Sequence, residues 1–314
     1  MPIYSYGEII KDARERQGVS QAALADGIID AGQLSRIERG TAKPNKATLE
    51  LIFERLGINH IFLAEYMLDV DDAEIEGIKS KIDAHLRQNE FADAKKLMTK
   101  LEKNKRFQDE QSAAYKPNMQ YIMSCKARLA KEEGQHNEAL AMYMEALYFL
   151  SPNFDLAKID KKFLLSKLDI QIINSIAGIY HAQRDLDKAI DLMLMLKANY
   201  DRRFMGAVEK GTLYPMTIYN LTKYLGMAGR HKEAIEYCEV GEKICHELGD
   251  MRMLPWIVYN KTASQSELGI KGIDYETIFR ELYYSFRLQK RYDEAIIVKG
   301  DARDYHGIDV HSAY

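Results

Sequence analysis

The stretch SQAALADGIIDAGQLSRIERG, residues 20–40, predicts two short helices joined by a tight turn. Ser20 is placed to cap the first helix, because its hydroxyl can accept a hydrogen bond from an amide two or three residues further on. Asp30 can cap the second helix in the same way. The apolar side chains that would pack the two helices together are Leu24, Ile28, Leu34 and Ile37.

The polar side chains of the second helix are left to face outward. Two helices arranged in this way are typical of a helix-turn-helix, in which the second helix enters the major groove of DNA. Gln33 can bond an adenine edge, and Arg36 either a guanine edge or a phosphate. Gln21 lies at the start of the first helix, where free amides favour a phosphate. The predicted DNA-binding residues are Gln21, Gln33, Ser35, Arg36, Arg39 and Lys43.

Helical patterns on both sides complete a small N-terminal domain. We expect helices over residues 6–17 and 46–56, the second between Asn45 as cap and Gly57 as stop. A fifth helix is expected after Asn59, with apolar residues Ile61, Phe62 and Met67. The residues predicted to close the core are Ile9, Ile10, Ala13, Leu49, Ile52, Phe53 and Leu56.

The strings GEIIKDARERQGVSQAALA (7–25) and LSRIERGTAKPNKATLELIFERLGI (34–58) resemble the Xre-type helix-turn-helix of phage repressors and bacterial regulators. The resemblance implies a structural ion pair between Arg14 and Glu38, and a phosphate contact for Gln21. The turn is one residue shorter than in typical phage repressors, and in this respect it is closer to the PlcR-type regulators.

Bulk charge does not favour nucleic-acid binding. The chain has a net charge of −3, and residues 1–66 carry eight Lys or Arg and nine Asp or Glu. Any DNA affinity must therefore come from the placement of the cations on one face. Two alternatives stay open, in which Gln33 is simply a solvated helix residue or the whole motif serves protein contacts within a scaffold.

The rest of the chain repeats a helical unit. Five segments share one pattern, a polar turn followed by a helix with Ala at a fixed place, and these alanines are Ala94, Ala139, Ala189, Ala234 and Ala295. Their separations are 45, 50, 45 and 61 residues, and one further helix is expected over 253–268. Such units bury their apolar faces only by stacking, and they resemble tetratricopeptide repeats with longer helices or loops.

The predicted fold is therefore all-α. We expect a five-helix Xre-type domain over residues 1–67, an acidic linker over 68–76, and a right-handed superhelix of about five tetratricopeptide-like helix pairs over 77–314.

Three asparagines occur at matching places in this repeat region. Asn174, Asn220 and Asn260 are 46 and 40 residues apart, each in the middle of a predicted helix. A row of amides facing the inner groove could bond the main chain of an extended peptide, because an amide both donates and accepts. Gln171 and Lys223 would share that face. Alternatively, each Asn bonds within its own repeat.

The combination of an Xre-type DNA-binding domain and about five repeats resembles the Rgg and PlcR group of peptide-pheromone receptors. The segments EALYFLSPNFD (145–155) and AIEYCEVGEKIC (234–245) add local matches. The resemblance implies a cytoplasmic, homodimeric transcription regulator that binds operator DNA and a short imported peptide. The alternative is a regulator of the same build whose repeats bind a folded protein.

The sequence gives little support to other classes of protein, such as secreted proteins, membrane proteins and enzymes. The start lacks a signal-peptide pattern and no run of ~18 apolar residues suggests a membrane span. Three cysteines without a secretion signal fit reduced, buried thiols. We find no Walker loop, GxGxxG, GxSxG or metal-spaced His/Cys set, so we predict no enzyme activity, no metal site and no cofactor.

Overall fold

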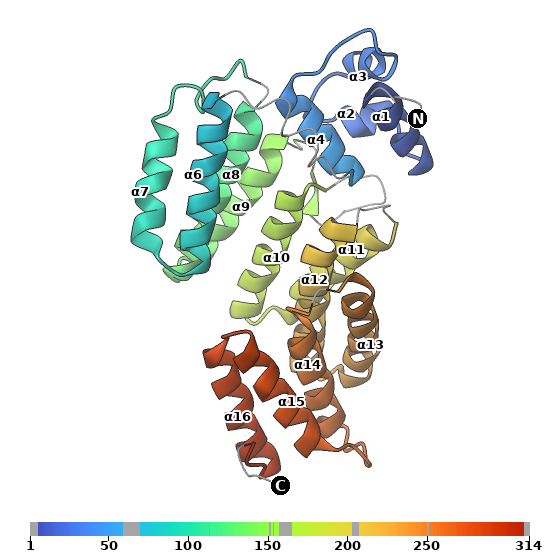
Figure 1. Cartoon of the computed structure of the whole chain (residues 1–314), viewed down its shortest axis with the longest axis vertical. Helices are drawn as coiled ribbons and strands as arrows, with labels where there is room; N and C mark the ends of the chain where they lie inside the picture. Colours follow the sequence, from blue (N-terminus) through green and yellow to red (C-terminus); the bar gives the residue numbers. More distant parts are fainter. Residues whose placement is uncertain are drawn as a thin grey trace. The chain divides into compact units, whose positions relative to one another are not determined.

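The computed structural model describes residues 6–58, 70–112, 114–150, 152, 154–156, 165–202, 207–249 and 251–310. These ranges contain fifteen α-helices and no β-strand, which confirms the predicted all-α class (Figure 1). Within the same ranges no helix combines the length and the apolar character that crossing a membrane requires.

The N-terminal domain begins with four described helices. Their bounds are α1 (Tyr6–Arg16), α2 (Gln21–Ala25), α3 (Ala31–Glu38) and α4 (Lys46–Leu56). All three predicted caps are confirmed, because the side chains of Ser20, Asp30 and Asn45 each accept a hydrogen bond from the amide three residues further on. Gly57 ends α4 in the left-handed conformation, as predicted. The fifth helix, expected after Asn59, lies outside the described residues.

The core of this domain is close to the predicted one. Its fully buried members are Ile10, Leu24, Ala25, Leu34, Ile37, Leu49, Ile52, Phe53 and Leu56. The prediction was wrong for Ile9, which is 38% exposed. Neighbouring residues on a helix point about 100° apart, so Ile10 takes the inward direction and Ile9 does not. A β-carbon at Gly7 would lie 2.3 Å from the carbonyl oxygen of Ile37, so α1 approaches α3 closely there.

Eleven further helices follow, and α6 begins inside the stretch expected to be linker. Their bounds are α6 (Val70–Arg87), α7 (Phe91–Glu102), α8 (Tyr115–Glu132), α9 (His136–Leu150), α10 (Lys167–Ala182), α11 (Leu186–Arg202), α12 (Ala207–Met227), α13 (His231–Leu248), α14 (Leu254–Glu267), α15 (Tyr275–Leu288) and α16 (Tyr292–His306). The chain divides into two compact units, Met1–Ile179 with Arg202–Gly206, and Tyr180–Asp201 with Ala207–Tyr314.

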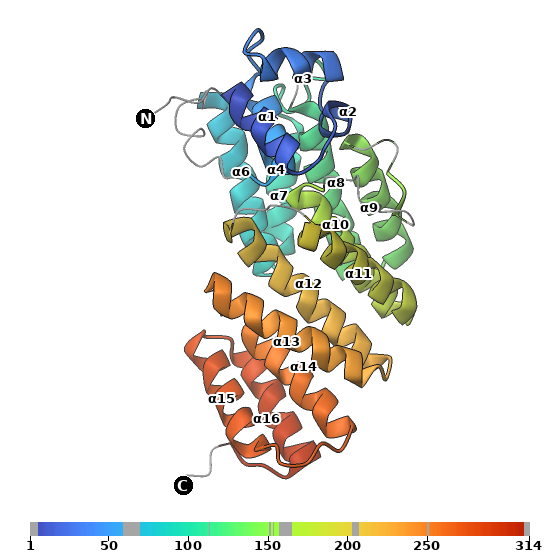
Figure 2. The same ribbon diagram turned by 90° about the vertical axis from the view of Figure 1, so that its right-hand side faces the viewer.

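Within each unit, consecutive helices lie side by side. In the first unit α6 packs on α7 and α8 on α9, and in the second α12, α13 and α14 pack together, followed by α15 on α16 (Figure 2). Buried apolar residues of α6, α7 and α8 form one continuous core in the first unit. Phe279, Phe286 and Val298 belong to a corresponding core between α15 and α16 in the second.

The five repeat alanines occupy the same place in five helices. Each is the fourth residue of its helix, in α7, α9, α11, α13 and α16, and each is 0–2% exposed. Each of these helices is also preceded, two residues earlier, by a residue with positive φ, and these are Asn89, Gly134, Arg184, Gly229 and Lys290. Each repeated unit therefore has a residue in the left-handed conformation, then the first turn of a helix, and a small buried side chain as the fourth residue of that helix.

The three cysteines are free and buried. Burial raises the pKa of the Cys125 and Cys238 thiols to about 12. They therefore remain protonated at neutral pH and act as small apolar side chains, as expected from the sequence.

Gly241 lets α13 pass close to its two neighbours. A β-carbon there would lie 2.7 Å from Cγ2 of Ile218 on α12 and 3.0 Å from Cδ1 of Ile257 on α14. Both isoleucines are fully buried and cannot move away cheaply. Gly241→Ala should therefore destabilise the chain by about 1–3 kcal/mol, although Ala favours helix.

The matched control is Gly300→Ala on α16, where an added β-carbon meets nothing within 4 Å. That change should stabilise by roughly 0.5–1 kcal/mol through helix propensity alone. Urea unfolding of the two variants measures both effects. A Gly241→Ala variant that is as stable as the unmodified chain, or more stable, would contradict the close packing assigned to Gly241.

Candidate DNA- and peptide-binding sites

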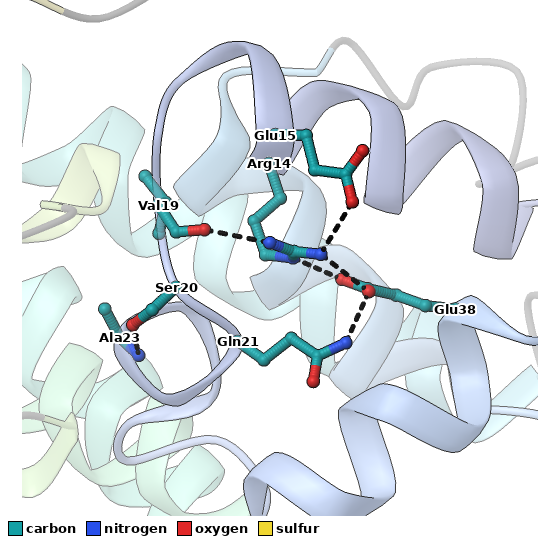
Figure 3. Close-up of polar contacts among 7 residues, drawn as sticks. All are labelled: Arg14, Glu15, Val19, Ser20, Gln21, Ala23 and Glu38. Carbon is teal, nitrogen blue, oxygen red and sulfur yellow. Dashed lines mark hydrogen bonds and ion pairs between the residues drawn. The ribbon is translucent and has the colours of Figure 1, made fainter.

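A buried ion pair between Arg14 and Glu38 ties α1 to the end of α3. Arg14 Nε donates to Glu38 Oε1 at 2.6 Å and Nη2 donates to Oε2 at 2.9 Å, a two-pronged contact (Figure 3). Arg14 Nη1 also donates to the carbonyl of Val19 at 3.0 Å. The pair thus joins α1, the loop before α2 and α3, and it holds α3 at a set angle.

Gln21 completes this cluster. Its Nε2 donates to Glu38 Oε2 at 2.7 Å (Figure 3). The amide nitrogen carries two hydrogens, so one remains for another acceptor. A phosphate contact by Gln21 stays a prediction, and the Glu38 contact would orient the side chain for it.

The ion pair shifts the pKa of both partners. Burial pushes the pKa of Glu38 upward, but hydrogen bonds from Arg14 and Gln21 outweigh it, and the net pKa lies below its usual value. The hydrogen bond to Glu38 raises the pKa of Arg14. Both groups are therefore charged at neutral pH, and each neutralises the other within the domain.

The predicted DNA-binding residues differ in exposure. Arg36, Arg39 and Lys43 are exposed, and among the described residues none of them forms an ion pair. Gln33 and Ser35 on α3 are half-buried. The end of α3 and the loop after it therefore present three unpaired cations together, although residues 1–66 as a whole are close to neutral. Which of them touch bases or phosphates stays a prediction.

Arg55 is a buried cation that the sequence interpretation did not single out. It is 4% exposed, and its guanidinium donates to the carbonyls of Leu24, Asp26 and Leu150, the last at 3.4 Å. Nearby, the amide of Lys167 at the start of α10 donates to Glu54 Oε1 at 2.7 Å. These contacts join α2 and α4 of the N-terminal domain to the first unit's repeats. An Arg within the apolar run LELIFERL was the available signal.

A cavity of about 720 Å³ lies among the helices of the second unit. Its volume is within the range of small-molecule sites. Most of the lining comes from α12 and α14, and it consists of Tyr219, Thr222, Lys223, Gly226, Met227, Gly229, His231, Trp256, Tyr259, Asn260, Ala263, Ser264, Glu267 and Ile297. The cavity thus contains two residues that the sequence predicted for peptide binding, Lys223 and Asn260.

Asn260 bridges the two helices that form the cavity. Its Nδ2 donates to the carbonyl of Tyr219 at 3.3 Å and to Thr222 Oγ1 at 3.0 Å, both on α12. A carbonyl only accepts, so these contacts assign Nδ2 to that side. Among the described residues Oδ1 of Asn260 has no hydrogen-bond partner, and it remains available to accept from a ligand amide.

The other predicted peptide-binding residues lie elsewhere. Asn220 is half-buried on α12 and does not line the cavity. Asn174, on α10 of the first unit, is buried, and its Nδ2 donates to the carbonyl of Ile170 in its own helix at 2.9 Å. Gln171 is exposed on the same helix. Peptide contacts by these three residues stay predictions.

Aromatic rings form one wall of the cavity. Trp256 meets Tyr259 edge to face with ring centres 5.4 Å apart, and Tyr219 lies 6.0 Å from Trp256. Burial raises the pKa of Tyr219, so its hydroxyl stays protonated. The cavity lining includes both Tyr219 and Trp256. Helical spacing alone does not distinguish a core ring from a ring at the edge of a cavity.

Metal binding has no counterpart in the part of the chain that the structure describes. No group of three or more His, Cys, Asp or Glu side chains there could hold a metal ion.

Comparison with known proteins identifies the N-terminal domain and the fold of the chain. Residues 10–63 match the family model of the helix-turn-helix domain. A search of curated protein sequences finds no match. PlcR of Bacillus thuringiensis, in complex with the peptide PapR7 and DNA, aligns over 94% of this chain and 98% of its own, at 18% identity and a TM-score of 0.59. Its apo form aligns over 93% and 97%, at 17% identity and a TM-score of 0.57.

The pheromone receptor Rgg2 of Streptococcus dysgalactiae aligns over 96% of this chain and 99% of its own, at 14% identity and a TM-score of 0.48. The family match shows that this chain has a helix-turn-helix domain over residues 10–63. The PlcR alignment shows that it shares the fold of PlcR along nearly its whole length.

Proposed function

We propose that this chain is a transcription regulator that binds operator DNA through α3 and is controlled by a short peptide bound in the cavity between α12 and α14. The observation that carries the proposal is the presence, on one chain, of a helix-turn-helix with exposed unpaired cations and a large cavity among repeat helices. PlcR, which has the same fold, was solved with both a peptide and DNA, and this supports the same pairing of ligands here.

We propose further that the chain acts in the cytoplasm as a homodimer. Two copies would present two reading helices to operator half-sites about 34–36 Å apart, or a multiple of that distance. The peptide would favour one arrangement of the repeats and thereby change the half-site spacing that the dimer can span. A ligand shifts such an equilibrium only by its difference in affinity for the two arrangements.

Mass spectrometry of ligands carried through native purification of the full chain tests the proposal. We expect an oligopeptide to co-purify, and we expect its removal to change the affinity for DNA fragments selected by the protein. Stable capture of a folded protein, with no affinity for short peptides, would favour the alternative in which the repeats bind a protein partner.

Asn260→Ala should weaken peptide binding about tenfold, because it removes an acceptor from the cavity and loosens the contact with α12. DNA binding in the absence of peptide should not change. Isothermal titration with the co-purified peptide and anisotropy with labelled DNA measure the two effects.

The matched control is Thr262→Val on the same helix, which removes a buried hydroxyl bonded to the carbonyl of Val258 and does not line the cavity. It should leave the peptide affinity unchanged. Equal loss of peptide and DNA binding in Asn260→Ala would contradict the separate roles assigned to the two sites.

A further inference from the structure

Lys223 is an unpaired cation in the wall of the cavity. It is half-buried on α12, and within the described residues it forms no ion pair. Two other lysines of the same unit are similarly buried, and each lies against a carboxylate. Lys197 Nζ, with its side chain 20% exposed, is 2.6 Å from Asp201, and Lys261 Nζ, at 22%, is 3.2 Å from Glu242. Lys223 differs from them in lacking such a partner.

An unpaired charge in such a place is costly, because burial removes water from the ammonium group. Burial accordingly lowers the pKa of Lys223, and no other group contributes to that shift. The positive charge also acts on a neighbouring residue, His181, whose ring stacks on Tyr224. Burial is the larger cause that lowers the pKa of His181, and the charge of Lys223 is the second. A ligand carboxylate beside Lys223 would offset this cost.

The other ionisable groups of the cavity do not provide that carboxylate. Glu267, at the end of α14, is exposed, and its carboxylate is therefore hydrated. His231 is the remaining ionisable group of the lining apart from the tyrosines, and its buried Nδ1 has no hydrogen-bond partner among the described residues. Among the described residues that line the cavity, Glu267 is the one carboxylate, and no ion pair joins it to Lys223.

Next to Lys223 the cavity is aromatic. Tyr219, one turn before Lys223 on α12, lies beside Trp256 on α14. An apolar side chain would be buried against these rings, while a carboxylate a few ångströms away would meet the ammonium group. Peptides carry both groups within a single residue or two neighbouring ones.

We infer that the cavity selects peptides that place a carboxylate against Lys223 Nζ and an apolar side chain against Tyr219 and Trp256. The inference rests on the proposed peptide-binding function and adds the chemical class of the peptide. The carboxylate is either the C-terminus of the peptide or the side chain of Asp or Glu.

Three synthetic heptapeptide libraries distinguish these sources. All are N-acetylated and built from apolar and neutral polar residues; the first ends in an amide, the second in a free carboxylate, and the third ends in an amide but contains one Glu. The full chain is mixed with equal amounts of each, separated by size exclusion, and the retained peptides are quantified by mass spectrometry. We compare the unmodified chain with Lys223→Met, which keeps most of the length of the side chain and removes its charge.

The unmodified chain should retain the second or third library at least about tenfold better than the first, and the enriched library identifies the source of the carboxylate. Lys223→Met should remove this preference and still retain apolar peptides. Lys271→Met, at an exposed lysine away from the cavity, should keep it. Thermal unfolding followed by circular dichroism checks that Lys223→Met folds; Lys223→Gln is the second variant.

Equal retention of all three libraries, or a preference that survives in both Lys223 variants, would overturn the inference while leaving peptide binding in place. Retention of no library by the unmodified chain would instead overturn the proposed function, and the inference with it.

Discussion

Replacing Arg36, Arg39 and Lys43 together by Gln is expected to weaken binding to a randomised 30-base-pair duplex by about 100-fold or more at 0.1 M salt. These side chains are exposed and have no acidic partner among the described residues, so their charge is available to phosphates. Each lost phosphate contact removes a released counterion, so the slope of log K against log salt should become shallower by about 3. Fluorescence anisotropy across a salt series measures both quantities.

The matched control replaces three exposed lysines outside the N-terminal domain, Lys105, Lys271 and Lys299, by Gln. The change in net charge is the same, but the affinity and the salt slope should change little. An unchanged slope in the first variant would mean that this face does not meet DNA. It would favour the alternative in which the helix-turn-helix serves protein contacts.

Arg14→Met is expected to destabilise the N-terminal domain by about 3–5 kcal/mol, because it leaves the carboxylate of Glu38 buried without its partner. The side chain of Glu38 is 2% exposed, and water cannot replace the two hydrogen bonds from the guanidinium. Hydrogen exchange of α1 and α3 in the full chain should accelerate accordingly. The control is Arg16→Met, whose side chain is 73% exposed beside Asp12, and it should change stability by less than about 0.5 kcal/mol.

The same pair predicts a pH dependence. The pKa of Glu38 is lower in the folded domain than in the unfolded chain. Its stabilising contribution is therefore complete above the usual glutamate pKa of about 4.3, and it is lost as the pH falls through the lower folded-state value. Arg14→Met should abolish this part of the acid sensitivity. Acid sensitivity of α1 and α3 that is equal in both proteins would contradict the assigned role of the pair.

The sequence was most informative where a signal is local. The caps at Ser20, Asp30 and Asn45 were predicted correctly, because a capping side chain acts within three residues of its own position. The five repeat alanines were found from the local pattern of a polar turn followed by a helix, since each occupies the same place in its helix. The left-handed turns before three of these helices were not foreseen, because Asn89, Arg184 and Lys290 occupy a conformation that usually favours Gly.

Direction and distance between helices were harder to predict. Ile9 has the same chemistry as Ile10, and only the packing of α1 decides which of the two is buried. Three asparagines at matching places in the sequence also have different surroundings. Asn174 bonds its own helix, whereas Asn260 bridges α12 and α14 beside a cavity. Asn220 lines no part of that cavity. Periodicity gives the place of a residue along its helix but not what that side of the helix faces.

By itself, the sequence determined an all-helical chain, a helix-turn-helix at residues 20–40 and a repeated helix pair marked by alanine, because capping, helical periodicity and small-residue spacing are short-range properties. Only the tertiary structure decided which side chains share a cavity, that Lys223 lacks a counter-ion there, and that Arg55 is buried. Those properties depend on the distance between helices far apart in sequence, and packing, rather than local propensity, sets that distance.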